Sequence, residues 1–125
     1  MVNPDVLFFF ASRPEALPLY EAFEQRLLAE LGGVRIKVQK TQIAFANRRN
    51  FAFVSLLPVR KARPKAYITV TIGLGRRLDS PRVDAAVEPY PNRWTHHLLI
   101  SAQEEIDGGL MEWVKEAAAF AAAKR

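Results

Sequence analysis

The segment RWTHHLLIS at residues 93–101 holds both histidines of the 125-residue chain and leads into its alanine-rich C-terminal end. Successive side chains of an extended strand point to opposite faces. One face is therefore predicted to carry Trp94 and His96 towards the core, and the other to carry Thr95 and His97. We interpret His96 as a core histidine whose ring nitrogens are satisfied by its neighbours, and His97 as the accessible, functional candidate. Removal of the Trp94 side chain is expected to cost roughly 3–5 kcal/mol.

The two histidines are not expected to share a metal ion, because adjacent strand positions diverge and the chain has no cysteine to complete a zinc shell. We expect no metal and no other cofactor. The lack of cysteine excludes disulfides and is compatible with a cytoplasmic protein, which is the location that we expect. The apolar run at residues 6–11 is too short to span a bilayer and has no signal-peptide features.

Two helices are predicted from apolar residues that recur every three or four positions. The first is expected to begin at a capping box in residues 12–15 and to end at the glycines 32–33. The second begins either at a capping box in residues 101–104 or at Asp107. Residues 5–11 fit a short helical turn or a strand. The apolar stripes are Leu17, Tyr20, Phe23, Leu27 and Leu31 in the first helix, and Leu110, Trp113 or Val114, Ala117 and Ala121 in the second.

Five strands are predicted where the apolar period changes to two or where the sequence is continuously apolar. Residues 58–65 are predicted to be a basic loop, and residues 73–92 a long surface loop that can fold across a site. The prediction is a single α+β domain over residues 1–125, with a five-stranded meandering antiparallel sheet and the N-terminal and C-terminal helices packed on one face. The strands are expected at residues 34–38, 42–45, 51–57, 66–72 and 93–101.

Basic residues concentrate in the middle of the chain. Residues 34–78 hold eleven Lys and Arg with no Asp or Glu, whereas the segments on either side are net acidic. Because both helices are expected on one face, the other face is left open, and parity places basic, hydroxyl and aromatic side chains on it, including Thr71. Such a surface attracts anions. The predicted ligand-binding residues are Arg35, Lys37, Lys40, Tyr67, Thr69, Arg93, Thr95 and His97.

We predict that the protein binds an anionic partner, preferably nucleic acid or a phosphate-bearing ligand, as a monomer or homodimer that does not associate with membranes. Residues 49–56 match five of the seven constrained positions in the aromatic strand of RNA-recognition motifs, but that fold needs a following helix, which residues 58–72 do not indicate. The alternative is a small hydrolase in which His97 is the general base near Thr95 and Lys40. A third hypothesis is an interaction module that pairs through a free sheet edge or the open face.

Four groups of residues are shared with a known family: Lys40-Thr41-Gln42-Ile43 with Phe45, Phe51-Ala52-Phe53-Val54, Arg93-Trp94-Thr95-His96-His97, and Ser101 followed by Glu105-Ile106-Asp107 and Trp113. Through them the chain resembles, over residues 6–123, a family of small bacterial proteins of unknown function. The resemblance implies an α+β module that occurs alone or at the C-terminal end of longer proteins, some loosely labelled as transport-related or linked to defence systems. It implies no catalytic residues, because the family has no established activity. The chain departs from the family's pattern at Gly108 and Gly109, where an acidic or helix-forming pair is usual.

Overall fold

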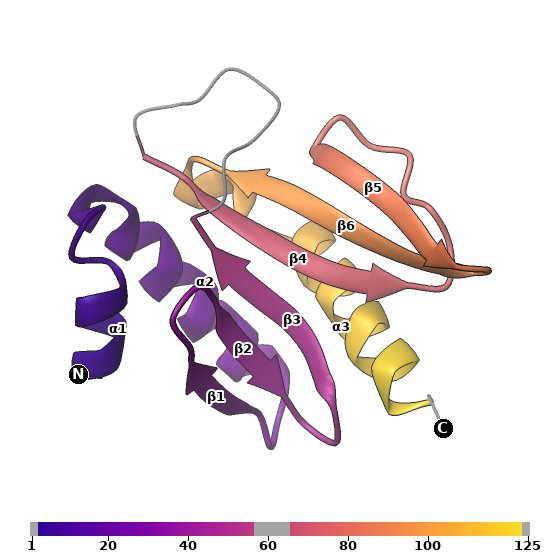
Figure 1. Cartoon of the computed structure of the whole chain (residues 1–125), viewed down its shortest axis with the longest axis horizontal. Helices are drawn as coiled ribbons and strands as arrows, with labels where there is room; N and C mark the ends of the chain where they lie inside the picture. The colour runs from indigo at the N-terminus through magenta and orange to yellow at the C-terminus, as the bar shows by residue number, and fades with distance from the viewer. Residues whose placement is uncertain (1–2, 57–65, 124–125) are drawn as a thin grey trace.

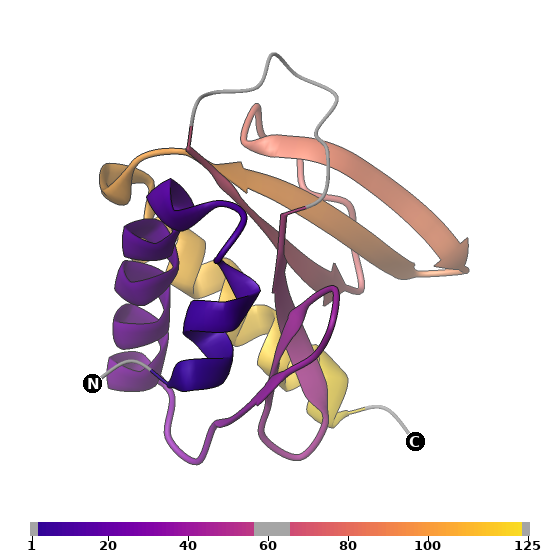
Figure 2. The same ribbon diagram turned by 60° about the vertical axis from the view of Figure 1, so that its left-hand side comes forward.

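Six strands form one antiparallel sheet in the part of the chain that the structure describes, residues 3–56 and 66–123 of a computed structural model. The spatial order is β1-β2-β3-β4-β6-β5, and α2 and α3 lie on one side of the sheet (Figures 1 and 2). The basic loop predicted at residues 58–65 lies outside the described residues.

The helices are α1 (Pro4–Phe9), α2 (Leu17–Glu30) and α3 (Gly108–Ala122), with short 3-10 helices at Pro14–Ala16 and Gln103–Glu105. The strands are β1 (Arg35–Val38), β2 (Ile43–Ala46), β3 (Asn50–Ser55), β4 (Ile68–Leu74), β5 (Val83–Tyr90) and β6 (Arg93–Ile100).

The core lies between the sheet and these two helices. α3 packs against β3 and β4 and also touches α2. α2 turns Tyr20 and Phe23 towards the sheet, and the ring of Phe23 meets Phe45 of β2 edge-on, with centroids 5.6 Å apart. Each such buried side chain contributes roughly 1.5–3 kcal/mol. The predicted helix stripes are buried at most positions, with Val114 rather than Trp113 fully buried in α3. The prediction of an α+β protein with an antiparallel sheet is confirmed.

The number of strands and their order differ from the prediction. The sheet has six strands rather than five, because residues 83–90 of the predicted loop form β5. β5 pairs with β6 at the edge, so β4 and β6 are neighbours and the sheet is not a simple meander. None of residues 83–90, all of them described, is fully buried, and a strand without a buried face need not alternate apolar and polar residues. Pro89 is tolerated at the sheet edge, where the pairing shifts between Val87 and Tyr90.

The helix that was predicted to begin at residues 12–15 begins later in the structure. The predicted capping box at residues 12–15 is wrong, since Pro14–Ala16 is a 3-10 helix and α2 begins at Leu17 with no side-chain cap among the described residues. Pro18 accounts for this later start, because proline lacks an N–H and fits the first turn of a helix. The segment for which a helical turn and a strand both fitted is helical, and forms α1.

α3 begins just after Asp107, one of the two predicted starts. The Asp107 carboxylate accepts the N–H of Leu110 at 2.9 Å, and such a cap stabilises a helix by about 1 kcal/mol. This cap lets the helix begin at Gly108 despite the paired glycines. The other predicted start, at residues 101–104, is wrong: a 3-10 helix at Gln103–Glu105 lies there, and Glu105, not Glu104, accepts the Ser101 N–H at 2.7 Å.

Candidate functional site

The two faces of β6 have the orientations that strand parity predicts. On the helix side, His96 is fully buried and its Nε2 accepts the N–H of Leu78 at 2.9 Å. No hydrogen bond of ordinary length and angle reaches its Nδ1 among the described residues, although the backbone of Ile72 and of Trp94 also interacts with the ring. Trp94, on the same side, is half-buried, and the guanidinium of Arg77 lies 5.7 Å from its ring centroid. Burial lowers the pKa of His96 below its ordinary value of 6.5, because the charged imidazolium loses its hydration.

A row of paired residues crosses all six strands on the opposite, open face of the sheet. Neighbouring strands lie about 4.8 Å apart. In this row, called the cross-sheet row below, Phe53 of β3 and His97 of β6 flank Thr71 of β4, and Lys37 lies at the β1 end. The members in strand order are Lys37, Ala44, Phe53, Thr71, His97 and Ala85.

Thr71 and His97 are in direct contact. The Thr71 Oγ1 lies 2.9 Å from the His97 Nδ1, and the tautomer of the ring decides which group donates. Both side chains are partly exposed, as is Phe53. Thr95 pairs with Gly73 beside the row and lines a small hollow of about 140 Å³ together with Phe53 and Thr71. A hydroxyl next to an imidazole is the first element of a nucleophile–base pair, but its partner here is Thr71 rather than the predicted Thr95.

Two predicted residues at or near β1, Arg35 and Lys40, do not reach the Thr71–His97 pair. Lys40 lines a hollow of about 630 Å³ with Phe8 and Phe9 near α1, and Arg35 donates to the carbonyl of Asn47 at 2.6 Å. Three strands separate β1 from β6, which corresponds to roughly 19 Å between their axes. The hydrolase hypothesis therefore has no Lys40 beside its general base.

Three further predicted residues lie outside the cross-sheet row. Tyr67 and Thr69 are each only 2% exposed, and the guanidinium of Arg13 lies 5.6 Å from the Tyr67 ring centroid. Arg93 is exposed at the turn between β5 and β6, where it pairs with Tyr90. A ligand on the surface meets neither Tyr67 nor Thr69 as they stand.

Phe53 and Thr71 lie next to each other in the cross-sheet row, and Thr71 contacts His97. Neither Phe53 nor Thr71 was among the predicted site residues. Residues 51–57 form an almost continuous apolar run, which has no period of two from which to choose the exposed side chains. Two signals in the sequence included Phe53: the partial match to an RNA-binding strand at residues 49–56 and the family-shared group at residues 51–54. Parity placed Thr71 on the open face, yet nothing in the sequence indicates that it pairs with His97.

The described residues contain no group of three or more His, Cys, Asp or Glu side chains placed to hold a metal ion. Over the same residues, no helix has both the length and the apolar character needed to cross a membrane.

Comparison with known proteins gives a single match. The model of a family described as a domain of unknown function (DUF5655) matches residues 8–121. The curated proteins and the solved structures contain no significant match.

Proposed function

Because the chain belongs to this family of unknown function, we propose from its own residues that the open face binds single-stranded nucleic acid, weakly and without sequence preference. The observation that carries the proposal is the cross-sheet row, in which two partly exposed rings, Phe53 and His97, flank the hydroxyl of Thr71. Aromatic side chains on an open sheet face stack unpaired bases, which a duplex keeps inside its own stack. The two rings are two strand spacings apart, about 10 Å, so each can take a separate base.

The charge on this face supports a polyanionic partner. Lys37 and Arg35 are exposed on β1, at one end of the row, and none of the six positions of the row is acidic. Lysine and arginine at the border of a stacking surface neutralise phosphates and release condensed counterions. Affinity should therefore fall steeply with added salt.

The direct test is a fluorescence anisotropy titration of labelled single-stranded and duplex oligonucleotides at roughly 50 and 200 mM salt. We expect binding at low salt, tighter for the single strand. Lys37→Glu should weaken binding and lower the salt slope by about one, because it removes one phosphate contact. Arg76→Glu is the charge-matched control: Arg76 pairs with Glu116 of α3 at 2.8 Å, on the helix side. No binding at low salt, or equal weakening by both reversals, would contradict the proposal.

A second pair of variants separates stacking from charge. Phe53→Ala should weaken single-strand binding by about tenfold, because stacking of a base on an aromatic ring contributes roughly 1–3 kcal/mol. Phe53→Tyr retains the ring and should bind like the wild type. Thermal melting of both variants confirms that the fold is intact. If Phe53→Ala binds as tightly as Phe53→Tyr, the face attracts polyanions by charge alone and the base-stacking part of the proposal is wrong.

A further inference from the structure

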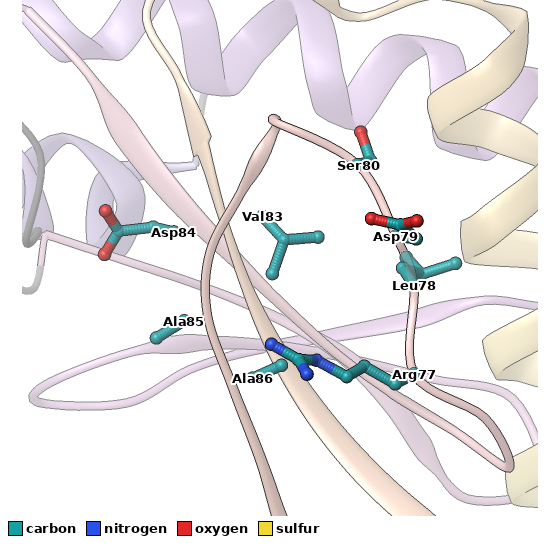
Figure 3. Close-up of a pocket in the computed structure, with 8 residues that line it drawn as sticks. All are labelled: Arg77, Leu78, Asp79, Ser80, Val83, Asp84, Ala85 and Ala86. Atoms are coloured by element: carbon teal, nitrogen blue, oxygen red, sulfur yellow. The ribbon is translucent and has the colours of Figure 1, made fainter.

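A third hollow lies at the other side of the sheet, near its β5 edge (Figure 3). It has a volume of about 490 Å³ and lies between residues 77–80, in the connection from β4 to β5, and the first half of β5. From β5, Val83 and Ala86 point towards this connection. Val83 is in register with Leu98 of β6, whose side chain is in the core, so the hollow opens on the helix side and not on the cross-sheet row.

Residues 77–80 form one wall of the hollow, and two residues of β6 contact this wall. The N–H of Leu78 donates to the buried Nε2 of His96, and the guanidinium of Arg77 lies over the ring of Trp94. A backbone hydrogen bond to a fully buried acceptor is costly to break, because it leaves a polar group unpaired in the core. Residues 77–80 are therefore held in place before any ligand arrives, as in most small-molecule sites.

Three charged residues line the hollow, Arg77, Asp79 and Asp84, and of these the Asp84 side chain points from β5 away from the connection (Figure 3). Arg77 and Asp79 both line the hollow, and among the described residues neither forms an ion pair. The guanidinium of Arg77 extends towards Ala86, across the gap between the connection and β5 (Figure 3). Ser80 adds a hydroxyl, whose oxygen already accepts the N–H of Arg82 at 3.2 Å. The hollow thus combines a guanidinium, a carboxylate and a hydroxyl with apolar side chains of β5.

We propose that this hollow binds a small zwitterion with a carboxylate and an ammonium group, from a free amino acid to a dipeptide in size. Arg77 presents its planar guanidinium for a two-point contact with the carboxylate, and Asp79 accepts hydrogen bonds from the ammonium group. A simple anion would be repelled by Asp79, and a simple cation by Arg77. Val83 and Ala86 offer apolar contacts to the rest of the ligand. This site is separate from the proposed nucleic-acid interface and does not depend on it.

The probes are three closely matched compounds: alanyl-alanine, its N-acetylated form, which lacks the ammonium group, and its C-terminal amide, which lacks the carboxylate. Each is titrated into the ¹⁵N-labelled full chain while the amide resonances of residues 77–86 are followed. We expect saturable shifts with the free dipeptide, and roughly tenfold or more weaker binding of both blocked forms, because each loses a charge-assisted contact. No saturable shift from the free dipeptide, or equal binding of all three compounds, would overturn the proposal.

Variants assign each charge to its partner. Arg77→Gln removes the partner of the carboxylate, so this variant should bind the free dipeptide and the C-terminal amide equally weakly. Asp79→Asn removes the partner of the ammonium group, so this variant should bind the free dipeptide and the N-acetylated form equally weakly. Asp84→Asn is the matched control for Asp79→Asn: Asp84 also lines the hollow, but its side chain points from β5 away from the connection (Figure 3). If either site variant keeps the wild-type preference, or if Asp84→Asn loses it, the proposed contacts are wrong.

Discussion

The two faces of β6 place their histidines in different environments, although each face has a histidine two positions after an aromatic or hydroxyl residue. His96 is fully enclosed and acts as a hydrogen-bond acceptor for the backbone of Leu78. His97 lies on the open face, partly exposed and in contact with Thr71. Adjacent residues of one strand thus serve different purposes: one holds the connection from β4 to β5 in place, and the other belongs to a surface available to a ligand. The type of side chain alone says little about its role, because burial decides whether the imidazole is a structural acceptor or an accessible surface group.

The largest difference between the two faces should appear when each histidine is removed. His96→Ala leaves a cavity and an unpaired N–H at Leu78, and we expect a loss of roughly 3–5 kcal/mol in the free energy of unfolding. His97→Ala should cost less than about 1.5 kcal/mol, the value of one partly exposed hydrogen bond. Urea denaturation of both variants measures the two losses. Equal losses would show that the faces are not distinct in energy.

Trp94→Ala should have a smaller effect than the roughly 3–5 kcal/mol expected from the sequence for a fully enclosed aromatic residue. The ring is half-buried and one of its faces is covered by the Arg77 guanidinium, so we expect roughly 2 kcal/mol. The same denaturation measurement applies. Arg77→Gln is the control, because it removes the cation but keeps the ring, and it should cost less than about 1 kcal/mol.

Acidification should destabilise the protein through His96 in particular. Because the folded-state pKa of His96 is below 6.5, the unfolded chain takes up the proton first. The contribution of neutral His96 to the free energy of unfolding is therefore complete above about pH 6.5. It is lost as the pH falls from there towards the folded pKa, by up to about 1.4 kcal/mol per pH unit. The added proton would face the Leu78 N–H at Nε2, and Arg76 and Arg77 also disfavour the charge.

Denaturation curves between pH 7.5 and 5 in steps of about half a unit measure this slope. His96→Gln offers an acceptor that does not titrate, and its slope should be flatter than that of the wild type. A wild-type slope in His96→Gln would show that His96 is not the group that takes up the proton.

The smallest effect is expected at the contact between Thr71 and His97. Thr71→Val keeps the shape of the side chain and removes the hydroxyl, so the loss should be about 0.5–1 kcal/mol. Thr95→Val is the matched control on the same face, because the Thr95 hydroxyl forms no hydrogen bond among the described residues, and it should leave stability almost unchanged. A larger loss for Thr95→Val than for Thr71→Val would place the important hydroxyl at the position that the sequence predicted.

The amino-acid sequence by itself determined the α+β class, the helix stripes and the division of β6 into a core face and an open face. These features follow from local periodicity, which arises wherever one side of an element is buried. It did not reveal β5, because residues 83–90 lie at a sheet edge and none of them, all being described, is fully buried. Pro89, read as part of a loop, is an edge residue instead.

Tertiary structure alone decided which residues meet. The order of the strands places β4 beside β6, which brings Thr71 to His97, and leaves Lys40 three strands away. It also returns the chain after β4 across the end of β6, where His96 and Trp94 hold Leu78 and Arg77. Such meetings depend on which strands become neighbours. Strand pairing joins residues that are far apart in the chain, and no local pattern records that choice.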